Sequence, residues 1–126
     1  ERARPVTTST RDADTGKRFR ELIERNYRNH PPLDFYARKL GVTPARLNAC
    51  CRIMTGKSSL ALINDRLLTE AKRNLLYSDM TMNEIGAALG YADPAYFNRF
   101  FSRNVGLSPG RFRERMLSGQ TPAVAV

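Results

Sequence analysis

The sequence predicts an all-α fold of seven helices, in which two helix-turn-helix units are joined by a long central helix. Apolar residues recur every three or four positions along most of the chain, which is the period of an amphipathic helix. A Leu-Gly turn followed by a cap residue and proline occurs twice, ending at Pro44 and Pro94. Between the two copies, residues 59–77 keep a helical apolar period without a glycine or a proline.

The first unit is expected over residues 17–57 and contains three helices. Proline cannot continue a helix, and glycine takes the left-handed conformation that follows many helix ends, so these residues set the boundaries. His30-Pro31-Pro32 ends the first helix, and Gly41 and Gly56 end the next two. The predicted helices cover residues 17–29, 34–40 and 44–55.

The central helix is predicted over residues 59–77, with Ser58 as its N-cap. The second unit is expected over residues 81–118 and begins with a capping box formed by Thr81 and Glu84. Its predicted helices cover residues 82–89, 94–104 and 109–118. Residues 1–15 lack an apolar period and are interpreted as a linker, and residues 119–126 as a flexible tail.

The second turn repeats the first. Thr43-Pro44-Ala45 matches Asp93-Pro94-Ala95 at a shift of 50 residues, and Leu40-Gly41 matches Leu89-Gly90 at a shift of 49. One residue has therefore been added in the second turn, around Ala92. Both glycines suit a left-handed turn conformation. Small residues precede both turns where two helices must cross closely: Ala37 and Gly86.

Composition indicates an anionic partner. The 126 residues include 21 Lys and Arg against 12 Asp and Glu, which gives a net charge of +9 and a pI of about 10.3. A basic domain of this size most often binds nucleic acid. No apolar run approaches the roughly 20 residues needed to cross a membrane.

An enzyme is disfavoured, and neither a metal nor a cofactor is expected. The chain has one histidine, His30, and lacks a phosphate-binding loop. Cys50 and Cys51 are adjacent, so on a helix they point about 100° apart and cannot easily form a disulfide with each other. No His or Cys lies at a metal-binding spacing from them. We interpret both thiols as small core residues.

The helix after the second turn carries groups suited to reading DNA. Phe97, Phe100 and Phe101 form one apolar stripe. Asn, Arg and Tyr side chains on the remaining face can donate hydrogen bonds to base edges and phosphates, and a small alanine permits close approach. An ordinary amphipathic helix with a solvated face remains an alternative for this segment alone. The outward residues are Ala95, Tyr96, Asn98, Arg99 and Arg103.

From about Leu33 to Arg113, the sequence resembles the DNA-binding domain of the AraC/XylS family of bacterial transcription regulators. The resemblance rests on ordered motifs spread over both units. They include Leu40-Gly41-Val42-Thr43-Pro44, Glu70-Ala71-Lys72-Arg73, Leu89-Gly90-Tyr91, Tyr96-Phe97 and Gly106-Leu107-Ser108-Pro109.

The resemblance implies two reading helices, Pro44 to about Thr55 and Pro94 to about Asn104, in adjacent major grooves of double-stranded DNA. A central helix of the predicted length would span about 28 Å, against about 34 Å between successive major grooves on one face of DNA. Phosphate contacts are expected from Thr43, Arg52, Lys57 and Arg103. Base contacts are expected from Ala45, Arg46, Asn48 and Ala49 in the first helix, and Pro94, Ala95, Tyr96, Asn98 and Arg99 in the second.

The sequence departs from the family pattern at Ala49, where a polar or basic residue is frequent. At the equivalent position of the second unit, Arg99 is a basic residue that can read a base. The second helix is therefore expected to discriminate bases more sharply. Family members usually carry an N-terminal effector-binding or dimerisation domain, which we expect outside this chain. RNA polymerase is a further expected partner. The protein itself is expected in the cytoplasm, at the bacterial nucleoid. The alternative is a helical protein-interaction module of the transcription machinery with little DNA affinity of its own.

Overall fold

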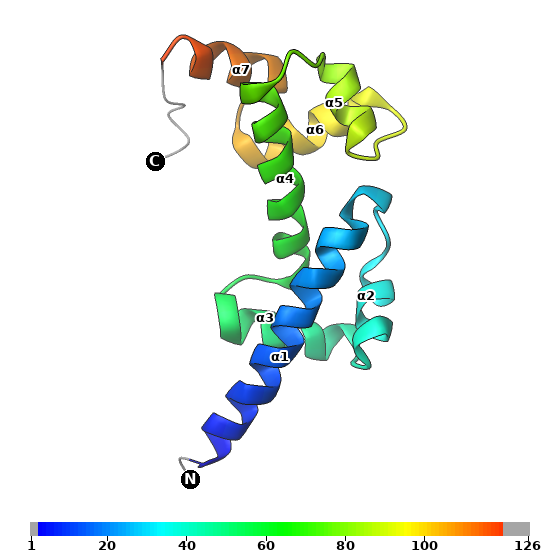
Figure 1. Cartoon of the computed structure of the whole chain (residues 1–126), viewed down its shortest axis with the longest axis vertical. Coiled ribbons are helices and arrows are strands. Elements are labelled where there is room, and N and C mark those ends of the chain that lie inside the picture. Colours follow the sequence, from blue (N-terminus) through cyan, green and yellow to red (C-terminus); the bar gives the residue numbers. More distant parts are fainter. Residues whose placement is uncertain (1–2, 120–126) are drawn as a thin grey trace. The chain divides into compact units, whose positions relative to one another are not determined.

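The computed structural model describes residues 3–119, with side chains from residue 10 onward. This part of the chain folds into seven α-helices and one 3-10 turn and contains no strand, which confirms the all-α prediction (Figure 1). It divides between Arg66 and Leu67 into two compact units. The elements are α1 (Ala3–Asn26), the 3-10 turn η1 (Tyr27–Asn29), α2 (Leu33–Leu40), α3 (Pro44–Thr55), α4 (Ser59–Tyr77), α5 (Met82–Ala88), α6 (Pro94–Val105) and α7 (Pro109–Leu117).

The start predicted for the first helix was wrong, because α1 begins at Ala3 rather than at residue 17. Residues 1–15 were interpreted as a linker because they lack an apolar stripe. Among residues 10–15, whose side chains the structure describes, the buried residue is a carboxylate, Asp12, which is only 1% exposed and packs against α3. An apolar period cannot indicate a helical turn whose buried side chain is polar, as it is at Asp12. Of the predicted tail, residues 120–126 lie outside the described part.

The core of the first unit forms where α1 packs against α2 and α3 (Figure 1). Phe19 of α1 contacts Tyr36 of α2 edge to face, with ring centroids 5.4 Å apart, and both side chains are fully buried. Such aromatic pairs contribute about 0.5–1.5 kcal/mol beyond the area they bury. The first turns of α4 join this unit through Arg66, which pairs with Glu24 and whose guanidinium carbon lies 4.6 Å from the centroid of the Tyr27 ring.

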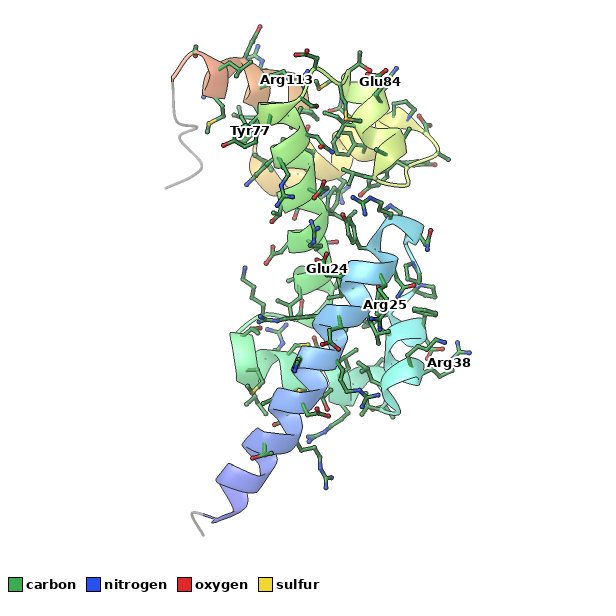
Figure 2. The ribbon with its side chains drawn as sticks, in the orientation of Figure 1. Glu24, Arg25, Arg38, Tyr77, Glu84 and Arg113 are labelled. Carbon is green, nitrogen blue, oxygen red and sulfur yellow. The ribbon has the colours of Figure 1, made fainter. Side chains whose placement is uncertain are left out.

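The core of the second unit is aromatic. Phe97 and Phe101 of α6 are buried on the helix face that contacts α5 and α7, and Phe101 meets Phe112 at a centroid distance of 5.5 Å. Arg113 of α7 points to the end of α4 (Figure 2). Its guanidinium donates to the carbonyl oxygen of Leu75 at 2.8 Å and to that of Ser78 at 3.2 Å. One cation thereby satisfies carbonyls that a helix end leaves without a partner.

The two helix-turn-helix turns share the backbone geometry that their sequences predict. Gly41 and Gly90 both adopt positive φ angles, of 72° and 89°. The N–H of Val42 donates to the Ala37 carbonyl at 3.0 Å, and the N–H of Tyr91 donates to the Gly86 carbonyl at 2.9 Å. The capping box of Thr81 and Glu84 is also present, and Figure 2 shows Glu84 at the start of α5. The sequence repeat is therefore a structural repeat.

Gly86 lies where α5 crosses α6. A β-carbon built at this position would stand 3.2 Å from Cβ of Phe97 and 3.4 Å from its ring. Phe97 is fully buried and cannot move aside without disturbing the aromatic core. The crossing therefore favours glycine, in agreement with the small residue that the sequence predicts here.

Gly86→Ala is expected to lower the free energy of unfolding by about 1–3 kcal/mol, because the added methyl group must displace Phe97 or separate the two helices. Thermal and urea unfolding followed by circular dichroism measure this change. Gly110→Ala is the matched control in the same unit, since a β-carbon there meets no atom within 4 Å. Equal unfolding midpoints for the two variants would contradict a tight crossing at Gly86.

Candidate nucleic-acid interface

The helices α3 and α6 each bury one face and expose the other. Leu47, Cys50 and Cys51 are buried on α3, and Phe97 and Phe101 are buried on α6. Positions three and four residues apart share a helix face, so the opposite faces can be assigned from spacing. The exposed stripes are Ala45, Ala49 and Arg52 on α3, and Ala95, Arg99 and Arg103 on α6.

The starts of both helices expose small side chains and are fixed by caps. Pro44 and Pro94 occupy the first helical position, where the absence of an N–H costs nothing. Thr43 accepts from the N–H of Arg46 at 3.1 Å, and Asp93 accepts from that of Ala95 at 2.9 Å, so each cap fixes where its helix begins. Thr43, Pro94 and Ala95 are exposed, as their expected DNA contacts require.

On α6 the predicted polar residues are exposed together. Tyr96 is 58% exposed, and Asn98 and Arg99 are exposed beside it. Asn98 accepts one hydrogen bond, from the hydroxyl of Ser102 at 3.2 Å, which leaves both of its amide N–H donors available. The guanidinium of Arg99 lies 4.9 Å from the centroid of the Tyr96 ring. The second reading helix therefore presents an amide, a guanidinium and a phenol on its surface.

On α3, Asn48 is occupied within the fold. It is partly buried, and its Oδ1 accepts from the backbone N–H of Ser59 at 3.0 Å and from the Ser59 hydroxyl at 3.4 Å. Ser59 is the first residue of α4, and its N–H has no acceptor inside that helix. The side chain expected to face a base thus caps the central helix. A helical period does not indicate this contact, because the contact joins residues on two elements.

The equivalent contact cannot form in the second unit. At the repeat shift of 50 residues, Asn48 corresponds to Asn98 and Ser59 corresponds to Pro109. Pro109 begins α7 and has no N–H to satisfy. One substitution in the repeat thus leaves Asn98 exposed, whereas Asn48 is held by its own fold.

Arg46 also has a partner within the first unit. Its Nη2 donates to Oδ1 of Asp12 at 3.1 Å, and the side chains of Arg46 and Asp12 are 47% and 2% exposed. The second carboxylate oxygen of Asp12 is buried without a hydrogen bond. Leaving a buried carboxylate without its cation is costly, so Asp12 holds Arg46 in place. Ala45 and Ala49 are exposed but offer only methyl groups.

The four candidate phosphate-binding residues are all exposed, but one has a competing partner. Lys57 Nζ lies 2.7 Å from Oδ2 of Asp65, and both side chains are about half exposed. Exposed pairs of this kind contribute about 0–1 kcal/mol, so a phosphate can compete for the lysine. Neither Arg52 nor Arg103 has an ion-pair partner among the described residues.

Neither cysteine offers redox or metal chemistry. Both thiols are buried and unoxidised, in agreement with their predicted place in the core. Burial raises the pKa of Cys51 to about 11, and burial, with Asp12 nearby, raises that of Cys50. A thiol is reactive only as its thiolate, so both groups are inert near neutral pH. No cluster of potential metal ligands occurs in residues 3–119.

A cleft of about 360 Å³ opens between α1 and α3, with Lys17, Cys51 and Met54 in its lining. Met54 lies about two and a half helical turns beyond Ala45, so it is on the opposite face of α3 from the exposed stripe. The cleft is thus separate from the candidate interface.

Over the part of the chain that the structure describes, no helix is long and apolar enough to cross a membrane.

Comparisons with known proteins place this arrangement in a family. Residues 36–115, which include both turns and both reading helices, match a family described as a helix-turn-helix domain. The chain belongs to the AraC/XylS family of transcription regulators. It is a DNA-binding domain of that family, which is a family of regulators and not of enzymes.

Several curated bacterial relatives support the assignment. The HTH-type transcriptional regulator ExsA of Pseudomonas aeruginosa is 28% identical over 98 residues, which cover 78% of this chain and 35% of that protein. The arabinose operon regulatory protein of Salmonella typhimurium is 31% identical over 85 residues, which cover 68% of this chain and 30% of that protein. The chain therefore spans about a third of the length of these relatives.

Solved structures agree on the fold. The C-terminal domain of the two-component response regulator yesN from Fusobacterium nucleatum has a TM-score of 0.72 at 21% identity, covering 79% of this chain and 98% of that one. The DNA-binding domain of AdpA, a global transcriptional factor solved in complex with a target DNA, has a TM-score of 0.69 at 20% identity. That comparison covers 87% of this chain and 97% of the AdpA domain.

Asn48→Ala is expected to lower the free energy of unfolding by about 0.5–2 kcal/mol, since the N–H of Ser59 loses its acceptor. Asn98→Ala, at the equivalent exposed position, should change it by less than about 0.5 kcal/mol. Urea unfolding measures both values. Asn48→Asp is the matched control, because it keeps an acceptor oxygen and should retain most of the stability. Equal destabilisation by both alanine variants would contradict the difference between the two asparagines.

Proposed function

We propose that this chain binds double-stranded DNA sequence-specifically, and that α6 supplies most of the base discrimination. One observation carries this assignment. The polar residues of α6 are exposed and available, whereas Asn48 and Arg46 of α3 are held by Ser59 and Asp12. Hydrogen bonds to base edges specify sequence, and contacts to phosphates fix position.

In this proposal α3 acts mainly as an anchor. Its exposed alanines permit close approach to the groove, and Thr43, Arg52 and Lys57 bind phosphates, as does Arg103 on α6. Arg46 reaches DNA only to the extent that a base or phosphate competes with Asp12. The excess of cations, with a net charge of +9, supports a strongly salt-dependent interaction.

We also propose that α3 and α6 bind adjacent major grooves of one duplex. The support is the length of α4, whose 19 residues correspond to about 28 Å along the helix axis. Contact with RNA polymerase, an effector site and dimerisation are proposals for a longer protein. They are supported by the greater length of the curated relatives, and a DNA-binding role would place the protein in the cytoplasm, at the nucleoid. We propose no catalytic activity.

Selection of bound duplexes from a random pool tests the function directly. A recovered consensus, with affinity that falls as salt concentration rises, supports sequence-specific binding. Equal recovery of all sequences would instead favour a helical protein-interaction module with little DNA affinity of its own. Shifting the two halves of the consensus by five base pairs, about half a helical turn, should abolish binding if adjacent grooves on one face are used.

Arg99→Ala is expected to reduce discrimination at one or two base pairs by about 1–3 kcal/mol, because a side chain that reads a base edge is lost. Competition binding with single-base variants of the selected duplex measures the change. Arg103→Ala is the matched control on the same helix, since loss of a phosphate contact weakens all duplexes alike. If Arg99→Ala also weakens selected and random duplexes equally, Arg99 does not read a base.

Lys57→Ala should weaken binding to every duplex and reduce the slope of log affinity against log salt by about one unit, the contribution of one phosphate contact. Titration at several salt concentrations measures this slope. Asp65→Asn is the control variant: it removes the carboxylate beside Lys57, so affinity should stay equal or rise. A salt slope unchanged in Lys57→Ala would exclude Lys57 from the phosphate contacts.

A further inference from the structure

We propose that Tyr96 positions the guanidinium of Arg99 for guanine recognition, so that the preferred duplex has a guanine at the base pair that faces Arg99. This inference rests on the proposed DNA-binding function and names both a positioning residue and a base. The two side chains are three residues apart on α6, which makes them neighbours on the helix surface. The guanidinium carbon of Arg99 lies 4.9 Å from the centroid of the Tyr96 ring.

The contact with the Tyr96 ring restricts Arg99 without engaging a hydrogen-bond acceptor. The positive charge of a guanidinium over a ring is attracted by the ring face, and this attraction leaves the N–H groups able to donate to a base. Arg99 is exposed and has no ion pair or hydrogen bond to a described residue. An arginine side chain loses rotamer entropy when it is fixed, and the Tyr96 ring restricts Arg99 before DNA arrives. The N–H donors of the Arg99 guanidinium are therefore restrained in position and have no hydrogen-bond acceptor among the described residues.

The first unit shows the opposite arrangement. At the repeat shift of 50 residues, Arg46 and Ala49 stand at the positions of Tyr96 and Arg99. Arg46 is held through its N–H edge by the buried carboxylate of Asp12, so the donors that could read a base are partly used. Ala49 has no donor. Of the two reading helices, α6 alone combines an exposed ring with an unpaired guanidinium.

The chemistry of the fork selects guanine. In the major groove guanine presents two neighbouring acceptors, O6 and N7, which match two parallel N–H donors. Adenine presents one acceptor beside an amino donor, cytosine presents an amino donor, and thymine presents a single acceptor beside a methyl group. A side chain with donors alone can form its bidentate contact only with guanine. The other bases leave one or both donors without a partner.

The test compares the wild-type chain with Arg99→Ala, Tyr96→Ala and Tyr96→Phe on single-base variants of the selected duplex. The wild-type chain should prefer guanine at one position, and Arg99→Ala should abolish that preference, with a loss of about five- to 150-fold. Tyr96→Ala should reduce the preference at the same position by about two- to fivefold, as expected for loss of an exposed cation–π contact. Tyr96→Phe keeps the ring and should keep the preference.

The ratio of the affinity for the guanine duplex to the affinity for the other single-base variants separates a positioning role of Tyr96 from a general structural role. Damage to the fold would weaken all duplexes and leave the ratio of guanine to the other bases unchanged. If circular dichroism shows that Tyr96→Ala does not fold, Tyr96→Leu replaces it and retains bulk without a ring. Unchanged affinity and unchanged preference in the ring-deleted variant would also overturn the role of Tyr96.

Failure of the proposed function and failure of this inference give different experimental results. If the wild-type chain selects no duplex, the proposed function falls and this inference falls with it. If a duplex is selected but Arg99→Ala leaves every guanine preference intact, the inference alone is overturned. If Arg99→Ala abolishes the preference but Tyr96→Phe does so as well, the phenol hydroxyl and not the stacked ring is responsible, which overturns the positioning role.

Discussion

The first backbone N–H groups of a helix have no acceptor inside that helix, and this constraint determines which side chains of the reading helices remain available. Ser59 begins α4, and its backbone N–H donates to the side-chain oxygen of Asn48. That amide of the first reading helix is therefore engaged in capping the central helix. Pro109 begins α7 without an N–H, and Asn98 is exposed. The different availability of Asn48 and Asn98 thus follows from a single residue at a helix start.

The two units share a turn geometry but not a surface chemistry. Both turns place a glycine in the left-handed region and close with the same backbone hydrogen bond. On this shared backbone, Arg46 of the first unit pairs with Asp12. In the second unit, the guanidinium of Arg99 lies over the ring of Tyr96. The first arrangement engages a guanidinium donor in a hydrogen bond to a carboxylate, and the second engages no hydrogen-bond acceptor of the described residues. A repeated backbone can therefore hold one helix for anchoring and another for discrimination.

Local chemistry made much of the fold predictable. The capping box at Thr81, the prolines at helix starts and the glycine turns all act within a few residues, so they are visible in the sequence. The early start of α1, the occupation of Asn48 and the pairing of Lys57 were not predicted. The first two depend on partners brought together only by the tertiary structure: Asp12 meets Arg46 across 34 residues, and Asn48 meets Ser59 across 11. The exposed residues of α6 were identified because exposure follows from helical spacing alone.

The burial of the two cysteines has a practical consequence. Both thiols lie in the core of the first unit, and the pKa of Cys51 is raised to about 11 by that burial. A cysteine introduced at an exposed position of α6 would meet no competition from these native thiols for an alkylating dye at neutral pH. The wild-type background can thus carry a single fluorophore on the second reading helix, and its emission would report directly on the approach of a duplex.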